Sequence, residues 1–272
     1  MSQTTQQKRA RFRELHEAGC FVLPNPWDVG SARMLEHLGF EAIASTGTGF
    51  AWTTGRPDYA LARDDVLGRL AALSAAVDVP VNADFESGFA TEPELLAANV
   101  RLAVGTGIAG LSIEDRLPGG DRLFDRRLAV ERIRAARHAI DQSGEDVILV
   151  ARTEILLSDP AALGTAIDTL VAFADAGADC LFAPGVAGKE AIGVMVRAVA
   201  PKPVNVLVMG SDMPLAAFAE LGVRRVSVGG GLAQVAWRAT IATAESFMRS
   251  TFDALATGIP GTELNNIFAK ST

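Results

Sequence analysis

Carboxylates follow two short apolar runs in the first half of this chain. Asp84 and Glu86 come after residues 79–83, and Glu114 follows residues 110–113. Carboxylates that meet at one place repel one another and raise their pKa values unless a cation shares them. Oxygen ligands alone favour a hard ion, so the pattern predicts a Mg²⁺ site, or a Mn²⁺ site, with Asp84, Glu86 and Glu114 as ligands. A solvated turn after each strand is the alternative explanation.

A zinc site is disfavoured. Zinc in proteins is held mainly by His and Cys side chains. His16, His37 and His138 all fall in segments with helical spacing, and neither Cys20 nor Cys180 has a ligand partner nearby. Each cysteine stands beside an apolar run, as expected of buried thiols in a reducing compartment.

Arg152 comes directly after the apolar residues 147–151, so its guanidinium is expected to emerge at the end of a buried strand. A planar guanidinium can hold a carboxylate through two hydrogen bonds. Arg152 is therefore a candidate clamp for the carboxylate of a ligand. An ion pair with Glu154 or Glu114 is the alternative, and both roles can hold together.

Thr46, Gly47 and Thr48 follow the run at residues 41–45. Backbone N–H groups beside glycine can approach an anion closely, and the hydroxyls add further donors. These three residues are candidate ligands of an anionic substrate. Asn205, inside the run at residues 204–208, is a further candidate for substrate binding.

Short apolar, β-branched runs alternate eight times with longer segments of helical spacing. The runs are residues 20–23, 41–45, 79–83, 110–113, 147–151, 180–183, 204–208 and 225–228. The helical segments are residues 31–38, 62–77, 91–105, 128–140, 159–176, 189–199, 214–221 and 233–249. Eight such repeats predict a (β/α)8 TIM barrel, whose active site lies at the carboxyl ends of the strands. An open Rossmann sheet would have a glycine-rich turn after the first strand, where this chain has PNPWD.

The barrel is expected to occupy residues 1–250 as a single domain, because barrels of roughly 250 residues are common. Residues 251–272 contain Gly258, Pro260 and Gly261 and end in an apolar-containing segment. We expect them to form a helical tail that packs on the barrel or on a neighbouring subunit.

The composition excludes several classes of partner. The net charge is −7, and the 25 basic residues are scattered among 32 acidic ones without a basic run, which argues against nucleic acid. Residues 1–19 are polar and charged, unlike a secretory signal, and no window reaches the roughly 18 apolar residues of a membrane span. A cytoplasmic protein without a membrane partner is predicted.

The segments at the predicted strand ends resemble those of the isocitrate lyase/phosphoenolpyruvate mutase superfamily. They are PNPWDVGSARMLEHLGFEAIASTGTG, GRPD, NADFESGFA, GLSIED, VARTE, GADCLFAPG and VNVL, in that order along nearly the whole chain. The resemblance implies that Asp84 holds Mg²⁺, with Glu86, Glu114 and Asp58 nearby through water. It also implies catalytic roles for Arg152, Glu114 and Asp58.

The resemblance further implies that the carboxylate of a small 2-oxo acid is held by Thr46, Gly47, Thr48 and Arg152. It implies a homo-oligomer, a tetramer or a dimer, in which the eighth helix of the barrel is swapped between subunits. The tail would then contact a neighbouring copy.

The loop after SIED differs from the well-known members of the superfamily. RLPGGDRLFD lacks the cysteine and histidine of the K-x-C-G-H loop of isocitrate and methylisocitrate lyases, and it lacks the lysine and asparagine of phosphonomutases. The leading hypothesis is a lyase, decarboxylase or hydrolase of oxaloacetate-like acids that works through a metal-stabilised enolate. Phosphonomutase or carboxyphosphonoenolpyruvate chemistry is the first alternative. A 2-oxo acid binding protein without turnover is the second.

Overall fold

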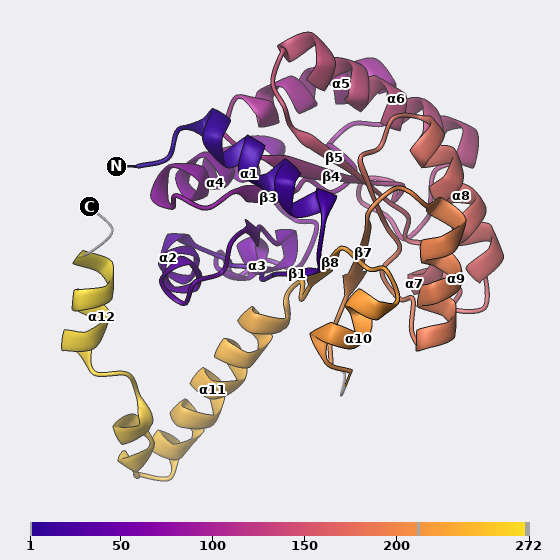
Figure 1. The fold of residues 1–272 in the computed structure, drawn as a ribbon. Helices are drawn as coiled ribbons and strands as arrows, with labels where there is room; N and C mark the ends of the chain where they lie inside the picture. Colours follow the sequence, from indigo (N-terminus) through magenta and orange to yellow (C-terminus); the bar gives the residue numbers. More distant parts are fainter. Residues whose placement is uncertain (1, 211–212, 270–272) are drawn as a thin grey trace.

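The computed structural model describes residues 2–210 and 213–269, and its core is a barrel of eight parallel strands (Figure 1). The strands are β1 (Phe21–Leu23), β2 (Ile43–Ala44), β3 (Val81–Asp84), β4 (Gly110–Glu114), β5 (Ile148–Arg152), β6 (Cys180–Phe182), β7 (Val204–Leu207) and β8 (Arg225–Ser227). Neighbouring strands pair in sequence order from β2 to β8, and β8 pairs with β1. Across the remaining edge, the Ala44 N–H donates to the Pro24 carbonyl at 3.0 Å. The predicted TIM barrel is confirmed.

Helices alternate with the strands as predicted. They are α1 (Thr5–Glu17), α2 (Val29–His37), α3 (Gly47–Trp52), α4 (Arg63–Ala76), α5 (Pro93–Val104), α6 (Arg126–Ser143), α7 (Ile155–Ser158), α8 (Leu163–Asp175), α9 (Lys189–Val199), α10 (Leu215–Glu220), α11 (Gly231–Met248), the 3₁₀ helix η1 (Asp253–Thr257) and α12 (Gly261–Ala269). Helices α3 and α7 are additions to the predicted set, whereas α1 contains His16, which the sequence had placed in a helical segment. A capping box marks the start of α1, where Thr4 accepts from the Gln7 N–H and Gln7 accepts from the Thr4 N–H.

Alternate residues of each strand face two separate cores. On β5, Ile148 and Val150 pack inside the barrel, whereas Leu149 and Ala151 pack against the surrounding helices. Both faces of the strand are therefore apolar, which is why the sequence shows continuous apolar runs in place of an alternating pattern. The inner core includes Phe12 of α1, so α1 closes the barrel at the amino ends of the strands.

His16 of α1 is buried beneath the barrel and is expected to make stability depend on pH. Burial, and next the positive charge of Arg225, lower the pKa of His16 to about 3. In an unfolded chain this pKa is about 6.5. Between these values the unfolded chain binds a proton that the folded chain does not, so the free energy of unfolding falls as pH falls through this window. The slope is up to about 1.4 kcal/mol per pH unit.

Urea denaturation between pH 4 and pH 7 measures this effect. The His16→Gln variant is expected to lose that part of the slope, whereas His138→Gln, at an exposed position on α6, is expected to retain it. Equal slopes for the wild type and His16→Gln would show that His16 does not cause the pH dependence.

Helix α11 leaves the barrel after β8 and extends away from it, and α12 returns to lie beside α2 (Figure 1). Large apolar side chains along α11 are exposed, among them Val235, Trp237 and Ile241. The predicted helical tail corresponds to η1 and α12, and its residues 270–272 lie outside the described residues. Within the described ranges, no helix is long and apolar enough to cross a membrane.

Candidate active site

A cavity of about 350 Å³ opens at the carboxyl ends of the strands. Most of the residues singled out from the sequence line it, and these are Thr46, Gly47, Thr48, Asp58, Asp84, Glu86, Glu114 and Arg152. They come from five different connections or strands, as expected for the mouth of a barrel. The sequence had therefore identified all the acidic residues that line this cavity.

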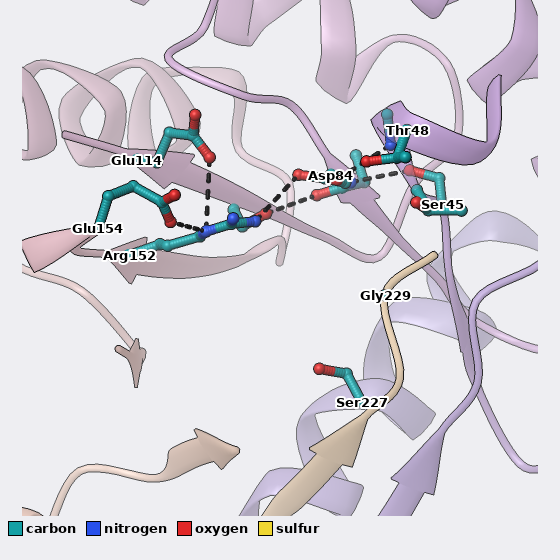
Figure 2. A network of polar contacts seen from close by, with 12 residues as sticks. Ser45, Thr48, Asp84, Glu114, Arg152, Glu154, Ser227 and Gly229 are labelled. Atoms are coloured by element: carbon teal, nitrogen blue, oxygen red, sulfur yellow. Dashed lines mark hydrogen bonds and ion pairs between the residues drawn. The ribbon is translucent and has the colours of Figure 1, made fainter. Parts of the chain in front are cut away.

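Arg152, the last residue of β5, lies at the centre of an acidic cluster (Figure 2). Its Nε is 2.5 Å from Glu154 Oε1 and 3.4 Å from Glu114 Oε2, and its Nη1 is 3.7 Å from Asp84 Oδ1. Burial opposes the charge of Arg152, but the three carboxylates hold the pKa of the guanidinium well above its usual range. Arg152 is therefore cationic at any accessible pH, and the predicted ion pairs with Glu154 and Glu114 are present.

The carboxylates of the cluster could carry more negative charge than Arg152 can balance. Burial, followed by repulsion from Asp84 and Glu114, raises the pKa of Glu86 to about 8. Burial also raises the pKa of Glu114, whose Oε1 is buried without a hydrogen-bond partner in the described part of the chain. Burial is also the main reason why the pKa of Asp58 is raised. An additional cation in the cavity would relieve this repulsion.

The donor set fits a hard cation bound mainly through water. The acids offer oxygen atoms only, which suits Mg²⁺ or Mn²⁺. Among residues 2–210 and 213–269, no three acidic, histidine or cysteine side chains converge closely enough to form a direct coordination sphere. Magnesium commonly retains several waters and takes only one or two protein carboxylates, so this spacing is compatible with it. This geometry allows direct ligation by one or two of the carboxylates and disfavours direct ligation by three.

The donors expected to hold a substrate anion are partly occupied by the protein itself. The Gly47 N–H donates to Asp84 Oδ2 at 3.0 Å, and the Thr48 hydroxyl donates to Asp58 Oδ2 at 2.6 Å. Thr46 is the N-cap of α3 and accepts from the Gly49 N–H at 3.3 Å. These residues therefore orient two acids of the cluster, and the TGTG segment is the start of a helix and not an open loop.

Glu86 reaches the cavity from the turn that follows β3. Strand β3 ends at Asp84, so Glu86 lies outside the strand. Glu86 has a φ of 50°, in the left-handed region, and this turn brings its carboxylate beside Gly47. This turn, and not the strand, therefore brings Glu86 to the cavity.

Asn205 lies behind the cavity wall, although the sequence suggested a contact with substrate. It is fully buried, its Nδ2 donates to Ser227 Oγ at 3.0 Å, and its Oδ1 accepts from Arg225 Nε at 2.9 Å. Asn205 therefore positions two other residues of the barrel interior.

Tyr59 and Asp115 were not among the candidate residues named from the sequence, and of the two Tyr59 lines the cavity. Tyr59 lines the cavity beside Asp58, and the guanidinium of Arg116 lies 4.5 Å from its ring centre. This contact joins the segment after α3 to the loop after β4. Asp115 lies deeper, where Thr153 Oγ1 and the Glu154 N–H both donate to its carboxylate. Asp115 thereby fixes Glu154 against Arg152.

The chain is similar in sequence and fold to known proteins. Residues 12–248 match the family model described as phosphoenolpyruvate phosphomutase. An uncharacterized protein of Mycobacterium tuberculosis is 35% identical over 220 residues, covering 80% of this chain and 81% of that protein. The 2,3-dimethylmalate lyase of Eubacterium barkeri is 28% identical over 222 residues, covering 78% and 75%. A crystal structure from Burkholderia cenocepacia J2315, assigned provisionally as a lyase/mutase, has a TM-score of 0.94 at 42% identity and covers 97% of each chain.

Proposed function

Because this chain belongs to the isocitrate lyase/phosphoenolpyruvate mutase superfamily, we propose that it is a Mg²⁺-dependent enzyme that makes or breaks the C–C bond next to a small 2-oxo acid. Members of the superfamily act on 2-oxo acids, and the relatives are lyases and related enzymes, so this protein is a lyase-like enzyme. The observation that carries the proposal is Arg152 within a surplus of carboxylates in one cavity.

In this proposal, the basic residue of the cavity binds the substrate and the acidic residues bind the cation. Arg152 would pair with the carboxylate of the 2-oxo acid and fix its orientation. A bound divalent cation would supply Lewis-acid stabilisation of the enolate that remains when the C–C bond breaks. Asp84 would hold that cation, and Glu86, Glu114 and Asp58 would position the waters around it. The hydrogen bond from Gly47 would keep Asp84 aimed into the cavity.

The second candidate is P–C bond chemistry on a phosphonate, which the phosphoenolpyruvate phosphomutase family model favours. The loop after β4 lacks the lysine and asparagine of such enzymes, so we rank this reaction below C–C chemistry. The third candidate is a 2-oxo acid binding protein without turnover.

One experiment separates the three. The Mg²⁺-loaded protein is incubated with 2-oxo acids, 2-hydroxy tricarboxylates and phosphonopyruvate, and NMR follows pyruvate, succinate, CO₂ and phosphorus-containing products. We expect turnover of an oxaloacetate-like acid that ceases on chelation of the metal. Conversion of phosphonopyruvate alone would favour P–C chemistry. Binding without any product across the panel would leave the non-catalytic function.

We also propose that α11 packs on a second copy of the chain in a homo-oligomer, a dimer or a tetramer. The projecting helix exposes Trp237 and Ile241, whose side chains are 47% and 52% accessible, and an exposed apolar face of this kind needs a partner surface. The tail after α11 would reach the same neighbour. Sedimentation equilibrium that gives the mass of one chain at micromolar concentration would contradict this. The cytoplasmic location stays a prediction from the sequence.

A further inference from the structure

Arg225 is a buried cation on the floor of the cavity. It is the first residue of β8, only 2% of it is accessible, and it lines the cavity below the acidic cluster. Its Nε donates to Asn205 Oδ1 at 2.9 Å, and its Nη1 donates to Asn82 Oδ1 at 3.2 Å. Its Nη2 donates no hydrogen bond to the described part of the chain. The N–H groups of Arg225 Nη2 are therefore available to a ligand that enters the cavity.

The neighbours of Arg225 are all neutral. No carboxylate of residues 2–210 or 213–269 lies within ion-pair distance of it, whereas Arg152 has three such neighbours. His16 Nε2 lies 3.4 Å from Arg225 Nη1, and the Nδ1 of the same ring is 2.7 Å from the Phe12 carbonyl. Because a carbonyl only accepts, the proton of the neutral His16 ring lies on Nδ1, and Nε2 faces Arg225 as an acceptor.

Burying a charge without a counter-charge is costly, and buried ions in proteins are generally paired. The two amide oxygens and His16 satisfy hydrogen bonds of Arg225 but leave its full positive charge uncompensated. A negatively charged ligand bound beside Arg225 would supply the missing counter-charge. The single charge of Arg225 matches one carboxylate better than a doubly charged phosphonate.

We propose that Arg225, with Asn82 and Ser227, forms a second carboxylate-binding subsite on the floor of the cavity. The proposal rests on the proposed function, and it specifies the substrate class as a 2-oxo dicarboxylic acid. Arg152 on β5 would hold the carboxylate next to the keto group, and Arg225 on β8 would hold the distal one. Strands β5 and β8 are three places apart in the barrel wall, so the two guanidinium groups approach the cavity from different sides.

Calorimetry on the Mg²⁺-loaded full chain tests the subsite with matched ligand pairs. Each pair differs only in its distal carboxylate, as in oxaloacetate against 2-oxobutanoate, 2-oxoglutarate against 2-oxopentanoate and 2-oxoadipate against 2-oxohexanoate. We expect the wild type to bind the diacid at least tenfold more tightly in one pair, and Arg225→Met to bind both members equally. Oxalate, whose two carboxylates are directly bonded to each other and which has no distal one, is expected to keep its affinity within twofold. Phosphonopyruvate is expected to gain less from Arg225 than the preferred diacid.

A second variant tests the subsite independently, in case Arg225→Met does not fold. Asn82→Asp is nearly isosteric and places a carboxylate beside Arg225 Nη1, so it is expected to raise the melting temperature and to abolish the preference for diacids. Oxalate binding with no preference for diacids in the wild type, or a preference that both variants retain, would overturn the subsite alone. Failure of every acid, including oxalate, to bind would overturn both the subsite and the proposed function.

Discussion

Replacing Arg152 with glutamine is expected to weaken the Mg²⁺-dependent binding of oxalate by about 30-fold or more. The guanidinium is the one cation in contact with Glu114, Glu154 and Asp84 among the described residues, and it is oriented by Glu154 at 2.5 Å. Loss of a hydrogen bond between charged groups costs about 2 kcal/mol, which corresponds to that change in affinity. Isothermal titration calorimetry with oxalate, at saturating Mg²⁺, measures it.

The matched control is Arg126→Gln, which removes an exposed arginine at the start of α6. Arg152→Gln also leaves buried carboxylates without their cation, so its melting temperature is recorded beside the affinity. A variant that melts earlier but binds oxalate with the affinity of the wild type would assign Arg152 to a purely structural ion-pair network. That result would assign Arg152 to the alternative role predicted from the sequence, an ion pair with Glu154 or Glu114.

The eight strands could be predicted because strands buried on both faces leave continuous apolar runs in the sequence. Residues that end those runs, such as Asp84, Glu114 and Arg152, then have only one place to gather in a barrel. This topological constraint made the acidic residues of the cavity and Arg152 predictable. It needed no knowledge of side-chain packing.

Local backbone conformation was not predictable in the same way. The TGTG segment has a poor composition for a helix, yet α3 forms because Thr46 caps it and Phe50 is buried in the core. A Cβ at Gly49 would lie 2.6 Å from Thr46 Cγ2 and 2.8 Å from Trp27 Cβ, so the glycine there is required by close packing. Tertiary contacts of this kind override intrinsic propensity.

The role of Arg225 could not be predicted because its position at the start of an apolar run is equally compatible with an exposed strand end. Which residues of a doubly buried strand face inward depends on the register of the barrel. Here β8 pairs Arg225 with Asn205 on one side and Phe21 on the other, so its side chain joins theirs in the interior. The same register places Asn205 beside Arg225, where its Oδ1 accepts from Arg225 Nε.

Substitution of Asp84 by asparagine is expected to abolish the effect of Mg²⁺ on oxalate binding and on thermal stability. The amide side chain would retain an acceptor for the Gly47 N–H, which lies 3.0 Å from Asp84 Oδ2, but would lose the charge that the cation needs. In the wild type, a ligand at 100 times its Kd stabilises the fold by about 2.7 kcal/mol. The variant is expected to show none of this gain in Mg²⁺ titrations followed by thermal melting.

The stability of the Asp84→Asn variant without metal distinguishes a lost site from a damaged fold. Asp84 is the largest source of repulsion on Glu86 after burial, so removal of its charge is expected to leave the metal-free protein at least as stable as the wild type. Asp64→Asn, an exposed acid at the start of α4, is the matched control and should respond to Mg²⁺ as the wild type does. A normal Mg²⁺ response in Asp84→Asn would remove Asp84 from the metal site. It would shift the role of direct ligand to Glu114, whose Oε1 is the buried oxygen of the cluster without a partner in the described chain.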